Sequence, residues 1–80
     1  MIYNEEIRRN IIREIIECGI SQTELAKLLN VKQPTIAQYI SGRAMPSLDT
    51  FANLCEVLDL DSNSILGIDR QSNYKKKGDK

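Results

Sequence analysis

The sequence predicts an all-α protein with four helices and a short fifth. Apolar residues recur at three- and four-residue spacings through most of the chain, which is the period of an amphipathic helix. No stretch alternates apolar and polar residues as a strand does. Single Gly, Pro, Ser and Asn residues stand where the helical stretches begin or end. The 80 residues are enough for one domain and no more.

The first helix is predicted from about Glu5 to Glu17. One broad apolar stripe runs along it and is expected to face the core, made by Ile7, Ile11, Ile12, Ile15 and Ile16. Gly19 follows, and glycine suits the left-handed backbone that ends many helices. The second helix opens with a capping box, in which Ser21 and Glu24 satisfy each other's amides. Asn30 ends it, because Asn tolerates the left-handed conformation well.

A third helix begins at about Gln33, with Pro34 in its first turn, and ends at Gly42. The link between the second and third helices is so short that the two must cross steeply. Such a crossing needs a small side chain where the two helices touch, and Ala26 is placed there. It also needs an apolar side chain of the third helix to fill the angle between them, and Ile36 is placed for that. Five further apolar residues would face the rest of the core: Leu25, Leu29, Val31, Tyr39 and Ile40.

Ser47 is predicted to cap a fourth helix, with Asp49 at its positive end. Five residues of this helix are expected inward: Leu48, Phe51, Leu54, Cys55 and Leu58. Asp61 or Ser62 caps a last turn or two that hold Ile65 and Leu66 and end at Gly67. These elements give a domain of residues 1–68, followed by a basic tail, 69–80, that we expect to be disordered.

The charges are balanced in number but not in position. Residues 22–46 have a net charge of +2 and residues 47–69 of −5, so the molecule has a mildly basic middle and an acidic back. Cys18 and Cys55 are isolated and there is no His, which excludes the usual zinc sites and CxxC redox pairs. With no secretory signal at the N-terminus, we interpret both cysteines as reduced packing residues of a cytoplasmic protein. No apolar run is long enough to span a membrane.

The stretch from Gly19 to Leu48 carries a specific set of residues. They are Gly19-Ile20-Ser21-Gln22-Thr23-Glu24-Leu25-Ala26, then Asn30-Val31, Ile36, Ser41-Gly42-Arg43 and Pro46-Ser47-Leu48. In these positions the sequence resembles the helix-turn-helix family of phage repressor and Cro-like regulators, the XRE type. The resemblance implies a five-helix, repressor-like DNA-binding domain that regulates transcription, commonly as a dimer. Asn30 stands where Gly is usual, and Lys32 where a Ser or Thr cap is common.

The resemblance also implies which residues meet DNA. A helix in the major groove reaches base edges with residues near its N-terminus. The residues expected at bases are Gln33, Thr35, Ala37 and Gln38. Those expected at the DNA backbone are Gln22, Thr23, Lys32, Ser41 and Arg43. The run Lys75-Lys76-Lys77 could be a non-specific DNA arm or a solvated tail.

These observations predict sequence-specific binding of double-stranded DNA, with repression as the expected output. A homodimer, or a monomer that pairs only on DNA, would read an inverted-repeat operator, and its contact surface is expected at 59–68. The alternative is a protein-binding helix-turn-helix module such as an antitoxin, anti-repressor or adaptor, which the neutral net charge leaves open. We expect no enzymatic activity, cofactor, metal, small-molecule ligand or membrane, because the chain has no His, phosphate loop or paired carboxylates in an apolar pocket.

Overall fold

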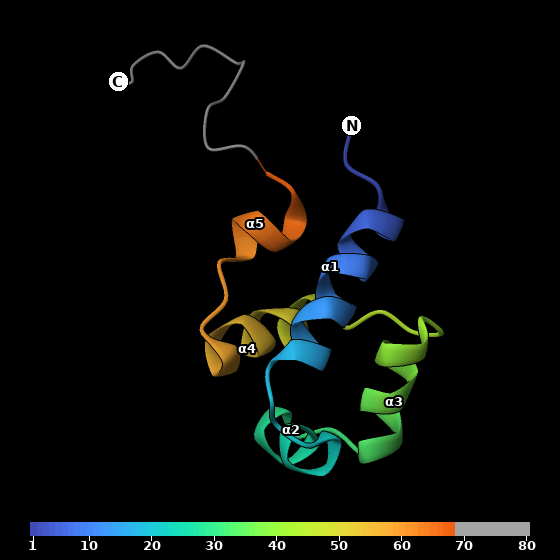
Figure 1. Cartoon of the computed structure of the whole chain (residues 1–80), viewed down its shortest axis with the longest axis vertical. Coiled ribbons are helices and arrows are strands. Elements are labelled where there is room, and N and C mark those ends of the chain that lie inside the picture. Colours follow the sequence, from blue (N-terminus) through green and yellow to red (C-terminus); the bar gives the residue numbers. More distant parts are fainter. Residues whose placement is uncertain (69–80) are drawn as a thin grey trace.

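The computed structural model describes residues 1–68, and this part of the chain holds five α-helices and no strand (Figure 1). The helices are α1 (Asn4–Glu17), α2 (Gln22–Leu29), α3 (Gln33–Ser41), α4 (Leu48–Leu58) and α5 (Ser62–Leu66). The all-α class and the order of the helices are therefore confirmed, and α1 begins one residue earlier than predicted. The tail 69–80, predicted to be disordered, lies outside the described residues.

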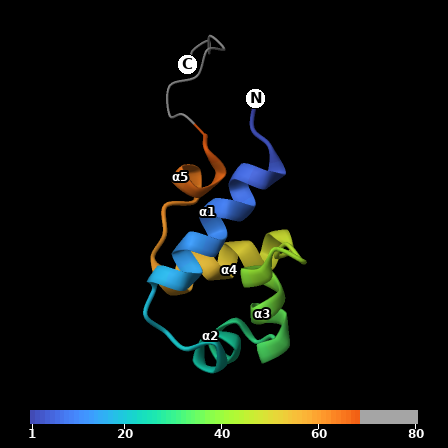
Figure 2. The ribbon, with the colours of Figure 1, turned by 45° about the vertical axis from the view of Figure 1, so that its right-hand side comes forward.

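The helices enclose one core to which all five contribute. α1 packs against α3 and α5, while α2 packs against α3 and α4. Figures 1 and 2 show α2 and α3 at the end of the molecule opposite to α5 and the N-terminus. The buried apolar side chains are Ile11, Ile15, Leu25, Ala26, Leu29, Ile36, Tyr39, Phe51, Leu54, Cys55 and Ile65. This arrangement leaves one side of α3 without a neighbour among residues 1–68.

The predicted single stripe along α1 is wrong in one respect. Ile11 and Ile15 are buried and Ile7 packs against the core, as expected. Ile16 is 62% exposed and Ile12 is only half-buried. Successive helix residues are rotated by about 100° around the helix axis. The helices that cover Ile11 and Ile15 therefore leave the residues that follow them, Ile12 and Ile16, closer to the outside. α1 therefore has a core stripe and a separate outward apolar ridge.

The α2–α3 crossing has the predicted parts. Ala26 and Ile36 are both buried in the core cluster, 3% and 0% exposed. Asn30 has the left-handed conformation, φ 58° and ψ 43°. The Asn30 and Val31 amides donate to the carbonyls of Lys27 and Ala26 at 3.2 and 3.0 Å, which ends α2 with the paired hydrogen bonds of a Schellman motif. These bonds satisfy carbonyls that the end of α2 would leave unpaired, and they fix the direction in which α3 starts.

The first turn of α4 corrects two predictions. Leu48 is not inward: it is 86% exposed, because the first residue of α4 lies beyond the edge of the core. Ser47 holds the N-cap position, but its hydroxyl donates to the Asp49 carboxylate and accepts no backbone amide. Asp49 Oδ1 instead accepts the Thr50 amide at 2.9 Å. These hydrogen bonds hold the pKa of Asp49 below its ordinary value, the one from Ser47 most.

α5 is tied to α1 by a contact that the sequence pattern did not predict. Asn10 Nδ2 donates to the carbonyl of Ile65 at 2.9 Å, and Ile65 is buried. Asp61 caps α5 by accepting the Asn63 amide at 3.2 Å, which decides between the two predicted caps. Both cysteines are free, Cys18 half-buried and Cys55 buried, in agreement with packing roles.

Candidate nucleic-acid interface

The side of α3 that faces away from the core carries the residues predicted at DNA bases. Gln33, Ala37 and Gln38 are exposed and Thr35 is half-buried. On the opposite side of the helix, Ile36 and Tyr39 are buried. Burial raises the pKa of Tyr39, so its phenol stays neutral at the core edge. The helix is therefore anchored by its apolar side and presents amide, hydroxyl and methyl groups to solvent.

Gln22 and Gln33 are joined across the helix crossing. Nε2 of Gln33 donates to Oε1 of Gln22 at 2.7 Å. Both residues are the first of their helices, so the crossing brings the two helix N-termini together. After this bond, Gln33 still has its Oε1 acceptor and one N–H group available to a ligand. Gln22 still has both of its N–H groups. Gln33 can thus still form a bidentate pair with adenine while Gln22 donates to a phosphate.

The first turn of α2 adds backbone donors beside this pair. Ser21 Oγ accepts the Glu24 amide at 3.1 Å, which confirms the serine half of the predicted capping box. The described hydrogen bonds contain no reciprocal bond from Glu24 to the Ser21 amide. The first amides of a helix have no partner within it and lie at the positive end of its dipole. Gln22 and Thr23 are exposed there and can bind an anion such as phosphate.

The turn after α3 places Arg43 next to the same surface. Gly42 has φ 82°, and the Arg43 amide donates to the Gln38 carbonyl at 3.0 Å. Ser41 is exposed, and its hydroxyl donates to that carbonyl at 3.1 Å, which leaves the oxygen free to accept but not to donate. Lys32 is exposed at the other end of α3, as its N-cap residue without a side-chain cap bond. Basic groups therefore flank the uncharged face of α3 at both ends.

Arg8 is a candidate that the sequence analysis missed. A Cβ added at Gly42 would lie 3.5 Å from Arg8 Cδ, so this α1 side chain reaches the turn that holds Arg43. Arg8 Nε is buried and has no hydrogen-bond partner in the described part of the chain. Neither the periodicity of α1 nor the motif pointed to Arg8, because its position depends on how α1 packs against α3.

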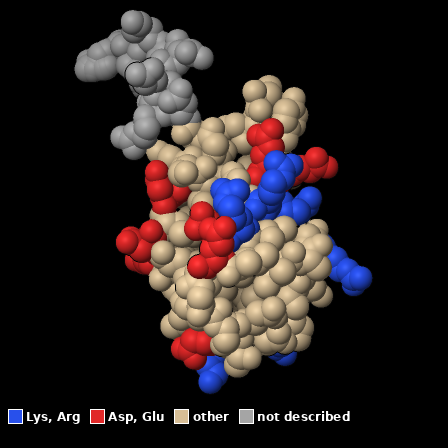
Figure 3. Space-filling model, in the orientation of Figure 1, with Lys and Arg blue, Asp and Glu red and all other residues tan. Residues whose placement is uncertain are grey.

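The charges agree with the predicted polarity. Among the described residues, the exposed acidic side chains of the C-terminal half lie on α4 and in the turn to α5: Asp49, Glu56, Asp59 and Asp61. In Figure 3, the surface over α3 is mostly uncharged, and acidic side chains lie beside α4 and α5 and also over α1 and near α2. The described residues contain no cluster of three or more metal-ligating side chains. None of their helices has the length and apolarity that crossing a membrane requires.

The chain is similar to regulators whose names describe transcriptional control. A Haemophilus influenzae protein named as an uncharacterized HTH-type transcriptional regulator is 40% identical over an alignment of 63 positions that covers 66% of this chain. This chain spans only 64% of that relative's length. A transcriptional regulator from Listeria innocua has a TM-score of 0.66 at 26% identity, over 86% of this chain and 64% of the other.

A further solved structure supports the fold alone. The SOS-response transcriptional repressor LexA from Eubacterium rectale has a TM-score of 0.70 at 17% identity, over 98% of this chain and 89% of that one. The family model HTH_3, described as helix-turn-helix, matches residues 11–65, which include all of α2, α3 and α4. The chain therefore belongs to the helix-turn-helix family, as its α2–α3 motif indicated.

Proposed function

We propose that this protein binds double-stranded DNA sequence-specifically and regulates transcription, as a repressor, with α3 lying in the major groove. The observation that carries the proposal is the outward face of α3, on which Gln33, Ala37 and Gln38 are exposed while Ile36 anchors the helix in the core. The regulator names of the relatives support it. Residues 1–68 would form the DNA-binding domain, and the protein would act in the cytoplasm, where its free cysteines stay reduced.

The proposed base contacts follow from the chemistry of each exposed group. The amides of Gln33 and Gln38 can pair bidentately with adenine. The methyl groups of Ala37 and Thr35 can pack on the methyl group of thymine. Because Gln33 is held by Gln22, its amide is oriented before DNA arrives. Loss of side-chain freedom on binding therefore costs less at Gln33 than at an unsupported glutamine.

The proposed backbone contacts surround this face. Lys32 and Arg43 would bind phosphates at its two ends, and Gln22 and Thr23 would bind one through the N-terminus of α2. Ser41 would add a weaker contact, for which its hydroxyl must turn from the Gln38 carbonyl to donate to a phosphate. To this set we add Arg8, whose side-chain Cδ lies next to Gly42 in the turn that holds Arg43. Such contacts fix the register of α3 on the duplex without reading its sequence.

A single small domain gives limited specificity, so we propose a homodimer on an inverted-repeat operator. Two recognition helices about 34 Å apart would enter successive turns of the same groove. The contact surface predicted at 59–68 remains a prediction. Most of the apolar side chains in this segment are turned inward, and Ile68, 45% exposed, is the apolar residue most available to a second copy.

A mobility-shift assay on a random duplex library tests the proposal against a protein-binding module. A DNA-binding protein shifts the library at low salt, and its affinity falls steeply as salt is added, because displaced counterions drive binding. A protein adaptor gives no shift at any salt concentration. A matched pair of variants locates the site: Gln38→Ala should weaken binding, and Asn53→Ala, on exposed α4 surface, should not. No shift for the wild type at low salt would refute the proposal.

A further inference from the structure

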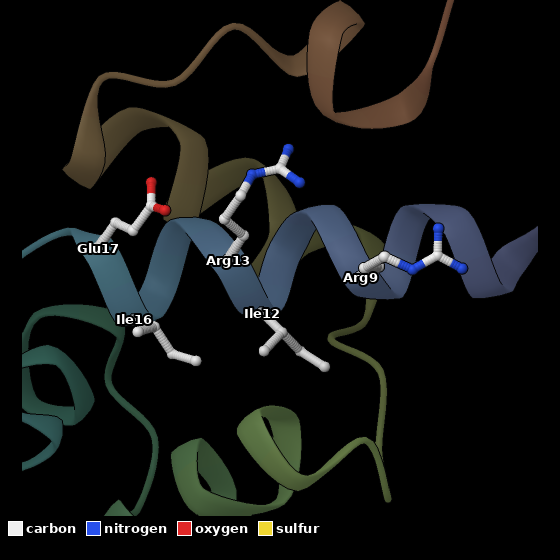
Figure 4. Close-up of a pocket in the computed structure, with 5 residues that line it drawn as sticks. All are labelled: Arg9, Ile12, Arg13, Ile16 and Glu17. Carbon is white, nitrogen blue, oxygen red and sulfur yellow. The ribbon is translucent and has the colours of Figure 1, made fainter.

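The outward apolar ridge of α1, made by Ile12 and Ile16, is only partly covered by the rest of the described chain. Arg9, Ile12, Arg13, Ile16 and Glu17 line one shallow hollow, and all five belong to α1 (Figure 4). Ile16 is 62% exposed, although isoleucine has no polar atom that would favour contact with water. Ile12 is half-buried, and Ile16 also lines a second hollow with Ile40 of α3, so the fold covers these two isoleucines only in part.

The outward face of α1 carries two parallel rows of side chains, of which the apolar ridge is one. Ile12 and Ile16 form an apolar row with a spacing of four residues, and Arg9, Arg13 and Glu17 form a charged row with the same spacing. Figure 4 shows the two isoleucines pointing toward α3, with Arg13 and Glu17 pointing to the opposite side. Figure 3 shows basic and acidic side chains next to each other over α1. The charged row reads basic, basic, acidic from the N-terminal end.

The two ends of this row complement each other when the helix is reversed. Consider two copies of α1 that pack antiparallel and are related by a two-fold axis perpendicular to both helices. The charged row of one copy then lies along the charged row of the other, and the two rows run in opposite directions. Arg9 of each copy then lies opposite Glu17 of the other, at both ends of the contact. Arg13 lies near the axis, where its guanidinium already donates to Asn10 Oδ1 at 3.1 Å. Between these charges, Ile12 of one copy lies about 3 Å along the helix axis from the level of Ile16 of the other, so the two side chains can pack against each other.

We propose that a second copy of this chain packs antiparallel on the outward face of α1. An acidic or a basic partner would leave one end of the charged row opposite a like charge, whereas a reversed α1 pairs both Arg9 and Glu17 with opposite charges and leaves only Arg13 opposite its own copy. α1 has 14 residues and is therefore about 21 Å long, so the contact belongs to the small, weak class of interfaces. We expect a dissociation constant between about 10 µM and 1 mM.

This inference deepens the homodimer of the proposed function by naming its surface, but it does not depend on DNA contact. It differs from the predicted surface at 59–68, where Ile65 is buried and its carbonyl is bonded to Asn10. The test is therefore made on the free protein, with a gel shift as a separate measurement. Loss of DNA binding with intact self-association would refute the proposed function alone.

The experiment is sedimentation velocity on the full chain up to about 1 mM, the weak end of the expected range. The wild type should self-associate, and Ile16→Glu should weaken the association at least tenfold. In Arg9→Glu, both ends of the charged row are acidic, and in Glu17→Arg, all three positions of the row are basic. Each variant alone would bring like charges together at both ends of the contact, so each should be monomeric. An equimolar mixture of these two variants should form heterodimers, because every end then pairs opposite charges. Glu56→Arg, on exposed α4, is the control that should leave association unchanged.

Circular dichroism of each variant shows that it is folded, which these exposed positions should allow. A monomeric wild type at the highest concentration would overturn the proposal. Self-association of Arg9→Glu alone at the wild-type level would also overturn it, and so would a mixture that stays monomeric. A contact through α5 would not respond to these charge reversals.

Discussion

Gln38 and Gln33 have the same side chain but different local support. Gln33 is held by Gln22, whereas the amide of Gln38 makes no hydrogen bond to another described residue and only its backbone carbonyl is used by the turn that follows. This difference makes Gln38 the cleaner residue for testing base recognition. Its truncation removes a candidate base contact and leaves the bonds of Arg43 and Ser41 to its carbonyl in place.

Gln38→Ala should weaken binding to the selected operator by about 1–3 kcal/mol and relax the preference at one base pair. The reason is the loss of one bidentate contact to a base edge. Selection from a random duplex library, performed with both proteins, measures the change in preference. An equal loss of affinity for every sequence would instead place Gln38 at the DNA backbone.

Arg43→Ala should weaken binding to all sequences alike. The expected reason is the loss of one phosphate contact, which lowers the slope of log affinity against log salt by about 0.9. A salt titration by fluorescence anisotropy measures both slopes. Lys27→Ala, another exposed basic residue, is the matched control and should leave the slope as it is. An unchanged slope in Arg43→Ala would remove Arg43 from the proposed backbone contacts.

The geometry of the helix-turn-helix unit depends on how closely α2 and α3 approach each other. Ala26 is 3% exposed and lies in the core cluster, and protein cores are packed too densely to accept a larger side chain without strain. Ala26→Leu should therefore lower the free energy of unfolding by about 1–3 kcal/mol, a large share of the stability of so small a domain. Urea unfolding followed by circular dichroism measures it. Ala52→Leu, on exposed α4 surface, should change little, and equal stability of both variants would mean that Ala26 is not at a tight contact.

The N-terminus of α4 should make stability depend on acid. The pKa of Asp49 is lowered, first by the hydroxyl of Ser47 and then by the amide of Thr50. A lowered pKa in the folded state stabilises the protein above the unfolded value near 3.8, and this stabilisation is lost as the pH falls through the folded pKa. Asp49→Asn should therefore lower the melting temperature at pH 7 and have less effect below the folded pKa. An equal effect at both pH values would contradict this account.

At the scale of elements, the sequence predicted where helices end better than which sides they bury. Asn30 and Gly42 end α2 and α3 through local conformational preferences, which a short segment can reveal. The exposure of Ile16 and Leu48 depends on which neighbours reach them, and that follows from packing between distant segments. Apolar character alone therefore placed both residues inward, and the structure places them outside.

At the scale of the whole molecule, the motif predicted the candidate site because its geometry is local. Gln33, Ala37 and Gln38 are exposed, as the local crossing of α2 and α3 predicted. Contacts between segments far apart in sequence could not be predicted in this way. Arg8 beside Gly42 and Asn10 bonded to the Ile65 carbonyl both depend on how α1 packs, which no periodicity encodes. The outward ridge of α1 was likewise hidden within a run of isoleucines.

The central claim is that the face formed by α3 and the N-terminus of α2 binds DNA. Titration of the isotope-labelled protein with a selected duplex, followed by amide chemical shifts, tests this claim most directly. The account predicts that the largest shifts fall at 22–23, at 32–43 and around Arg8, while most of α4 and α5 changes little. Shifts concentrated on α4 and α5, or no shifts at a salt concentration low enough to favour binding, would contradict it.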